Sequence, residues 1–277
     1  MGLNSVNTNV GAQIALQNLN STNKDLGVTQ GRINTGLKIA SAKDNGAVWA
    51  IAQNQRAESN SLNAVMSSLQ RGQSVVDVAL SAGQAISDLL IQMKEKAVAA
   101  TESGLTTSSK QALSDEYAAL RAQIDTISDN ATFDGVNLIQ DASTSSVSIK
   151  AIANSSASAT IDVDHADLST NNSAIGATLS VLTGTVSSSA ITDIESAIQA
   201  VSSALSKLGT GAKALDTHLN FVSKLQDTLD AGVGNLVDAD LAKESAKLQA
   251  LQTKQQLGVQ ALSIANQSSG ILLGLFR

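Results

Sequence analysis

Apolar side chains recur every three or four positions over a long stretch in the last third of the chain. Thirteen of the fourteen positions in this series are aliphatic, and Gln226 is the exception. This spacing places successive side chains on one face of an α-helix. The stretch therefore predicts a helix of forty-odd residues, on the order of 65 Å long. The series is Ile191, Ile194, Ile198, Val201, Leu205, Leu208, Ala212, Leu215, Leu219, Val222, Gln226, Leu229, Val233 and Leu236.

Seven-residue repeats predict two more helices in the first half of the chain. Residues 47–103 carry two adjoining series, which indicates a helix covered by more than one neighbour. Residues 108–130 carry a shorter apolar stripe that includes Tyr117 and Ile124. The first series is Leu62, Leu69, Val76, Gly83, Leu90 and Ala97, and the second is Val65, Gly72, Ala79, Ile86 and Met93.

The two ends of the chain are also predicted to be helical. Residues 1–37 repeat apolar side chains at Ala12, Leu19, Leu26 and Ile33. A helix over 236–277 has two apolar faces, although a helix beside water needs only one. We expect the termini to pair with each other and to use their remaining apolar faces to bind other copies of the chain. The first C-terminal face is Leu241, Leu248, Leu251, Val259 and Leu262, and the second is Leu257, Ala261, Ile264, Ile271 and Leu275.

The middle of the chain departs from helical spacing. An Asp-Gly turn signal within residues 133–139 predicts a hairpin. Weak alternation over 146–150 and 160–164 indicates short strands. Residues 141–189 are rich in Ser, Thr, Asn and Ala, which fits an exposed region carrying O-linked sugars or an ordinary polar loop region.

Composition favours an elongated helical bundle. Together with the patterns above it predicts a mainly α, antiparallel bundle of paired N- and C-terminal helices, with a small β-hairpin region at its distal end. The chain has no proline, which would break a long helix, and only five aromatic residues among its 277. Aromatic side chains normally supply much of the core of a compact enzyme. Aliphatic residues and alanine instead suit the narrow seams between helices.

Charge and cysteine content exclude several partners and sites. A net charge of −6 with scattered Lys and Arg argues against nucleic acid. No cysteine is present for disulfides or thiolate metal sites. The sequence shows no signal-peptide pattern at its start and no uninterrupted apolar window of about 18 residues, so we expect no membrane insertion.

The search for chemistry predicts no catalytic, cofactor-binding or metal site. His165 and His218 have no second histidine at metal-ligand spacing, and His218 is expected on a helix surface. The segment 209–213, GTGAK, lacks the spacing and the preceding strand of a phosphate loop. Acidic residues near 238–244 are better explained by the dipole at the start of a helix than by a cation.

Motifs at both ends of the chain resemble bacterial flagellins. In the first half these are Asn7-Thr-Asn9, INTGLKIASAKD at 33–44, Ala50-Ile-Ala52 and FDGVNL at 133–138. In the second half they are Asp238, Asp240, Ala242 and Glu244, then Gln255-Gln256-x-Gly258, Leu262 and Ala265-Asn266-Gln267. The matches cover roughly residues 1–140 and 190–277, in the family's order. The chain departs from the family pattern at 45–48 and 267–270, which bears on local packing.

The resemblance implies a subunit of the flagellar filament with a reduced outer domain. Residues 1–44 and 236–277 would form inner-tube helices and a connector, residues 45–140 and 190–235 the outer tube, and 141–189 a variable surface region. The implied partners are other flagellin subunits, the type III export apparatus with its chaperone, the filament cap and the hook-junction proteins. The implied location is the extracellular filament.

The residues expected to carry assembly lie on the terminal helices and the connector. The assembly residues are Leu19, Leu26, Ile33, Leu248, Leu251, Leu257, Val259, Leu262, Ile264, Ile271 and Leu275. The connector residues are Gly36, Leu37, Ile39 and Asp44. Two rivals remain: a hook–filament junction protein of the same terminal design and a flagellin with a catalytic insertion. A secreted coiled-coil adhesin would fit the apolar seams but would not explain the motif matches.

Overall fold

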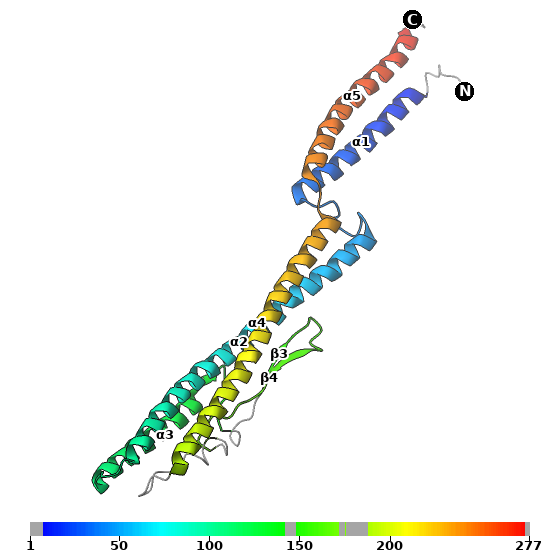
Figure 1. The fold of residues 1–277 in the computed structure, drawn as a ribbon. Coiled ribbons are helices and arrows are strands. Elements are labelled where there is room, and N and C mark those ends of the chain that lie inside the picture. Colours follow the sequence, from blue (N-terminus) through cyan, green and yellow to red (C-terminus); the bar gives the residue numbers. More distant parts are fainter. Residues whose placement is uncertain (1–7, 142–147, 172–174, 176–187, 275–277) are drawn as a thin grey trace. The chain divides into compact units, whose positions relative to one another are not determined.

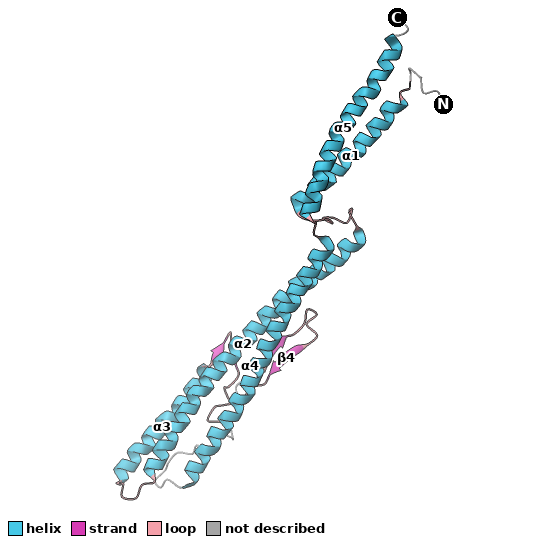
Figure 2. Ribbon diagram, turned by 45° about the horizontal axis from the view of Figure 1, so that its top comes forward, coloured by secondary structure: helices cyan, strands magenta, loops and turns pink. Residues whose placement is uncertain are grey.

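The structure is a computed structural model that describes residues 8–141, 148–171, 175 and 188–274 (Figure 1). The predicted mainly α fold is confirmed. The described residues form five helices and two short antiparallel strand pairs (Figure 2). The helices are α1 (Val10–Thr35), α2 (Gly46–Ala100), α3 (Thr107–Asn130), α4 (Ser188–Val237) and α5 (Leu241–Gly274). The strands are β1 (Thr132–Phe133), β2 (Val136–Asn137), β3 (Ile149–Ile152) and β4 (Thr160–Val163).

The chain divides into two compact units. Met1–Ala57 and Thr228–Arg277 make up one, here called the terminal unit, and Glu58–Asp227 make up the other, the central unit. The terminal unit holds α1, α5, the start of α2 and the end of α4. The central unit holds α3, both strand pairs and the greater part of α2 and α4.

Short polar side chains and one glycine fix where the helices begin and end. The Asn9 side chain accepts a hydrogen bond from the Ala12 amide (2.9 Å) and caps α1. Thr106 caps α3 in the same way. Such caps satisfy amides that have no partner within the helix. Gly36 ends α1 in the left-handed conformation, at φ 71°, which glycine adopts without strain.

In the central unit α2 and α4 run antiparallel, as the apolar repeats predict. Successive contacts pair rising numbers in α2 with falling numbers in α4. α3 also packs against α2, where the Lys96 ammonium lies 2.7 Å from a Glu116 carboxylate oxygen. The contacts between α2 and α4 are Asn63 with Gln226 (3.1 Å), Gly72 with Leu215, Gly83 with Leu205, and Lys94 with Glu195 (2.8 Å).

The core of the central unit consists mainly of aliphatic side chains from these three helices, with Tyr117 of α3 and Leu138 and Ile139 after β2 also buried. Ile86, Leu90 and Ile194 have no solvent exposure. A side-chain carbon built on Gly83 would lie 2.6 Å from Leu205, so this glycine allows close helix packing. α2 is the one described helix whose length and composition would suit a membrane span. Packing of its apolar side chains into this core accounts for that hydropathy, as it does in the core helices of other proteins.

The hairpin predicted at 133–139 forms, and the short strands expected near 146–150 and 160–164 are present and pair with each other. Asp134 and Gly135 have positive φ angles of 51° and 78° and make the tight turn between β1 and β2. β3 pairs with β4 in a register that joins Ile149 to Val163. The Ile152 amide donates to the Ser68 hydroxyl (3.0 Å), which attaches this hairpin to α2.

The structure corrects the predicted C-terminal helix. The sequence suggests that Leu236 leads directly into a continuous helix, but α4 ends at Val237 and α5 begins at Leu241. The Asp240 side chain accepts hydrogen bonds from the amides of Ala242 and Lys243, both at 3.1 Å. This cap starts a new helix, so the helix-terminus role expected for the acidic cluster holds at Asp240. The N-terminal helix runs from Val10 to Thr35, within the stretch 1–37 that carries the predicted repeat.

Candidate assembly surface of the terminal helices

α1 and α5 lie side by side and antiparallel in the terminal unit (Figure 1). On the α1 side of their seam, the predicted positions Ala12, Leu19, Leu26 and Ile33 alternate with the smaller residues Ala15, Thr22 and Thr29. Thr22 and Thr29 are the buried residues of α1, and the predicted aliphatic positions are only half-buried. The seam therefore leaves its large aliphatic side chains incompletely covered. The series is Ala12, Ala15, Leu19, Thr22, Leu26, Thr29 and Ile33.

Polar contacts along the seam set the register of the two helices. They begin near the start of α1 and the end of α5 and finish at the opposite ends. Arg32 and Glu244 form an ion pair whose side chains are 28% and 12% exposed. Charged pairs in such positions specify alignment more than they add stability. The contacts are Asn9 Nδ2 to the Ala265 carbonyl (2.7 Å), Gln255 Nε2 to Asn23 Oδ1 (2.7 Å), and Arg32 Nη1 to Glu244 Oε1 (3.0 Å).

α5 has apolar residues on all sides, and its packing against α1 buries few of them. Leu251 is buried, whereas Leu257, Val259 and Ile264 are 59%, 53% and 68% exposed. α1 adds further exposed aliphatic side chains away from the seam. Soluble monomers rarely leave contiguous apolar surface of this kind uncovered. The exposed side chains of the pair are Val10, Ile14, Leu16, Val28, Leu241, Leu257, Val259 and Ile264.

The predicted assembly residues fall into three groups in the structure. Leu19, Leu26, Ile33, Leu248 and Leu262 are half-buried, Leu251 is buried, and Leu257, Val259 and Ile264 are exposed. The backbone of Ile271 continues α5, while its side chain and all of Leu275 lie outside the described residues.

Sequence reasoning placed Val259 on the same face as Leu251, yet Val259 is largely exposed. Val259 lies at the edge of that face, because it is eight positions from Leu251 and so turned by about 80° around the helix. The prediction also left out Val10 and Val28. Their separation of eighteen residues, five full turns, is the signal that puts them on one side of α1.

The connector between α1 and α2 is tied to the segment between α4 and α5. Leu37 bridges to Asp238, and the Lys38 amide donates to the Val237 carbonyl at 2.7 Å. Ile39 is buried and packs with Val233. The cluster around it is Ala52, Val237, Leu37, Val48, Trp49 and Leu236.

Asp44 organises the turn that follows. Its carboxylate accepts hydrogen bonds from the Ser41 amide (2.9 Å), the Ser41 hydroxyl (3.1 Å) and the Ala40 amide (3.1 Å). The bonds from Ser41 lower the pKa of this carboxyl below its ordinary 3.8. Asp44 is thus ionised at neutral pH and holds the chain in the bend that leads into α2.

Both histidines have structural roles. His218 Nε2 lies 2.7 Å from the Ala153 carbonyl, and His165 Nε2 lies 3.0 Å from the Gln140 carbonyl. His218 therefore secures the β3–β4 hairpin to α4. Residues 209–213 lie inside α4 and form no phosphate loop.

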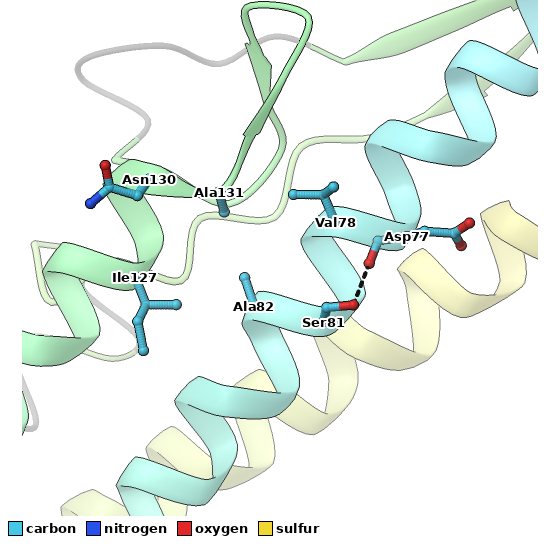
Figure 3. A pocket seen from close by; sticks show the side chains of 7 residues that line it. All are labelled: Asp77, Val78, Ser81, Ala82, Ile127, Asn130 and Ala131. Carbon is cyan, nitrogen blue, oxygen red and sulfur yellow. Dashed lines mark hydrogen bonds between the residues drawn. The ribbon is translucent and has the colours of Figure 1, made fainter.

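Within the described residues we find no group of side chains arranged to bind a metal ion. The hollow between α2 and α3 is lined mainly by Val78, Ala82, Ile127 and Ala131 (Figure 3). The Ser81 hydroxyl bonds to the backbone of Asp77, whose carboxylate points away from the hollow (Figure 3). No reactive side chains converge in this hollow, so the surface of interest is the terminal pair.

Comparison with known proteins agrees with this arrangement. Residues 6–144 match the bacterial flagellin N-terminal helical region, and residues 191–276 match the C-terminal helical region. The chain belongs to the bacterial flagellins. Two flagellins of Caulobacter vibrioides, FljM and FljK, are 58% and 57% identical to it over 277 residues, with all of each chain covered.

Family membership makes the chain a structural subunit of the bacterial flagellar filament, an extracellular structure, and not an enzyme. Its 277 residues fit a flagellin with a reduced outer domain. A putative flagellar hook-associated protein from Vibrio parahaemolyticus shares the fold, with a TM-score of 0.55 over 70% of this chain and all of the other. At 13% identity this likeness shows the fold alone and does not support the hook–filament junction alternative.

Proposed function

We propose that α1 and α5 of this flagellin build the inner tube of the filament and that α2, α3 and α4 build the outer tube. The observation that supports this assignment is the exposure of aliphatic side chains on both helices of the terminal pair, with Leu257 and Ile264 the clearest examples. In the proposal, residues 1–44 and 236–277 face the channel of the tube, residues 45–140 and 190–235 surround them, and 141–189 face outward.

Neighbouring copies cover these exposed side chains in the polymer. Complete burial of a Leu, Ile or Val side chain stabilises by about 1.5–3 kcal/mol, so several per subunit give a strong drive to assemble. The covered faces of α1 and α5 differ from each other. A contact between unlike surfaces that does not close into a ring generates a helical polymer.

The weak packing of α1 and α5 within one chain also suits export before assembly. α1 contains Asn18, Asn20, Asn23, Gly27 and Gly31, all poor helix formers. Its pairing with α5 buries little large apolar surface in one chain. The terminal helices of the free chain therefore order weakly, which suits passage through the type III export channel with a chaperone. They gain full order when the subunit adds beneath the filament cap, beyond the hook-junction proteins.

Seeded elongation of purified chain tests this function. Short filament fragments supplied with the full chain are expected to lengthen in proportion to the chain added, as measured in electron micrographs. A junction protein would add a limited number of copies and stop. Growth that ends after a few subunits would contradict the filament assignment. The matched control is the chain with Leu257 and Ile264 both changed to Ser, which should fold its central unit and fail to elongate the seeds.

A further inference from the structure

Asn45 and Gly46 form the one Asn-Gly pair in the sequence, and they lie where the connector meets α2. Every other asparagine is followed by a residue that carries a side chain. Glycine has no Cβ, so its backbone nitrogen is open to close approach by a neighbouring group. Both residues are exposed, so water reaches them. The pair therefore combines a reactive side-chain amide, an unhindered nitrogen and water.

The start of α2 places the Asn45 side chain beside the first turn of the helix. Its Oδ1 accepts a hydrogen bond from the Val48 amide at 3.2 Å, and its backbone carbonyl accepts one from the Trp49 amide at 2.9 Å. A donor on Oδ1 draws electrons from the side-chain carbonyl carbon, which makes that carbon easier to attack. Gly46 is the first residue of α2, so its amide has no acceptor within the helix. The space beside Gly46 is open, since a Cβ built there would have no neighbouring group within 4 Å.

We propose that Asn45 is a site of spontaneous covalent modification, at which the chain loses ammonia and gains a carboxylate. The Gly46 nitrogen forms a bond to Cγ of Asn45 and gives its proton to solvent. The bond between Cγ and Nδ2 breaks, and Nδ2 leaves as ammonia with a proton taken from solvent. The product is a five-membered cyclic imide. Water then adds to one of the two ring carbonyls and breaks the bond from that carbonyl to the Gly46 nitrogen, so the net reaction consumes one water and releases one ammonia.

The two ring carbonyls lead to different products. Opening at Cγ restores the ordinary backbone and leaves an aspartate at position 45, which still caps α2. Opening at the backbone carbonyl leaves an isoaspartate, in which the chain runs through the side chain of this residue and gains a carbon atom. The carbonyl that accepts from the Trp49 amide then becomes a free carboxylate. Because Val48 and Trp49 pack against the cluster around Ile39, the isoaspartyl form should loosen that cluster.

The modification accumulates with the age of the chain, because the released ammonia is lost to solvent. Each event adds one negative charge to a chain whose net charge is −6. The proposal concerns the chemistry of a single chain and goes beyond the filament function, so the two can fail separately.

Peptide mapping of the full chain tests the site. The chain is held in mildly alkaline buffer for increasing times and digested briefly with trypsin, and a sample taken at time zero corrects for reaction during digestion. Cleavage after Lys43 and Arg56 leaves Asn45 in one peptide with Asn54, which serves as the internal control because glycine does not follow it. Mass spectrometry locates the mass gain that accompanies replacement of an amide by an acid, and chromatography separates the aspartyl from the isoaspartyl peptide. The matched control variant is Gly46→Ala, which the open space beside this residue accommodates.

Asn45 is expected to convert several-fold faster than Asn54, to both products, and Gly46→Ala should slow its conversion several-fold. Emission from Trp49, the single tryptophan, should move to longer wavelength as isoaspartate accumulates, whereas Asn45→Asp should keep the emission of the fresh chain. Conversion of Asn45 no faster than that of Asn54, or equally fast in Gly46→Ala, would overturn the modification site. Unchanged Trp49 emission in the isoaspartyl chain would overturn the loosening of the cluster. Seeded elongation by fresh chain is read separately, so neither result decides the filament function.

Discussion

The central unit and the terminal unit are built from the same aliphatic residues and bury them very differently. Ile86 in the central unit has no exposure, whereas Ile264 in the terminal unit is 68% exposed. The first side chain lies in the core of the central unit, whereas the second lies on α5, whose packing against α1 leaves it in solvent. The difference teaches that the central unit carries its own core and that the terminal unit depends on other copies for most of its apolar contacts.

Removal of residues 255–277 should have the largest effect on assembly and almost none on the folding of the central unit. The truncation takes away Leu257, Val259 and Ile264 and should abolish polymerisation. The central unit should stay folded, because α5 belongs to the terminal unit and the central unit has its own buried core. Sedimentation and electron microscopy measure polymer, and the emission of Tyr117, the single tyrosine, reports the central unit. Filaments formed by the truncated chain would contradict the conclusion that assembly depends on the terminal unit.

Ile86→Ala should cause the largest loss of stability in the central unit. The substitution leaves a cavity at a fully buried site. Such changes cost about 2–5 kcal/mol in free energy of unfolding. Urea denaturation followed by far-ultraviolet circular dichroism and by Tyr117 emission measures the loss. A change of no more than a few tenths of a kcal/mol would show that this core is not closely packed.

Alkaline pH should destabilise the central unit before the terminal unit. Burial raises the pKa of Tyr117 from the ordinary 10.0 to about 12. The buried phenol is neutral in the folded chain, so its stabilisation is complete below pH 10 and is lost as the pH rises through 12. Two pKa units correspond to about 2.7 kcal/mol.

Denaturation at pH 9 and pH 11.5 compares the two conditions. Tyr117→Phe is the matched control, because it keeps the ring and removes the titrating group. A Tyr117→Phe chain that loses the same stability over this range would assign the effect to other groups.

Ile264→Ala should have the smallest effect on the free chain and a clear effect on assembly. The side chain is mostly solvated, so the free energy of unfolding should change by no more than about 0.5 kcal/mol. In the polymer the missing contacts should raise the concentration needed for assembly. Light scattering of seeded samples measures that concentration, with Gln260→Ala as the control at an exposed polar position on α5. Equal assembly of both variants would remove Ile264 from the assembly surface.

Much of the fold follows from periodicity in the sequence. The three-and-four spacing predicts α4 because it places the apolar side chains on one face, and Leu208 and Leu215 on that face are buried. The Asp-Gly signal predicts the first hairpin because those two residues tolerate positive φ. The break after Val237 was missed because the apolar spacing continues through it. A single side-chain cap at Asp240, which spacing does not reveal, starts α5.

The assembly surface on α1 and α5 could be predicted only in part, because the sequence does not show how the two helices pair. Heptad spacing shows that a helix has an apolar face but not which partner covers it. The exposure of Val259 and Val28 depends on how α1 and α5 pair, and that register is set by polar contacts such as Arg32 with Glu244. Those contacts join residues more than two hundred positions apart, so no local sequence pattern predicts them.

Hydrogen exchange, compared between the free chain and the filament, tests the central claim most directly. In the free chain the amides of α3 and of the middle of α2 and α4 should be protected, while those of α1 and α5 exchange rapidly. In filaments both sets should be protected, because neighbouring copies then cover the terminal pair. Mass spectrometry of peptides from the two states measures this. Terminal helices already protected in the free chain, or still unprotected in the filament, would contradict the account.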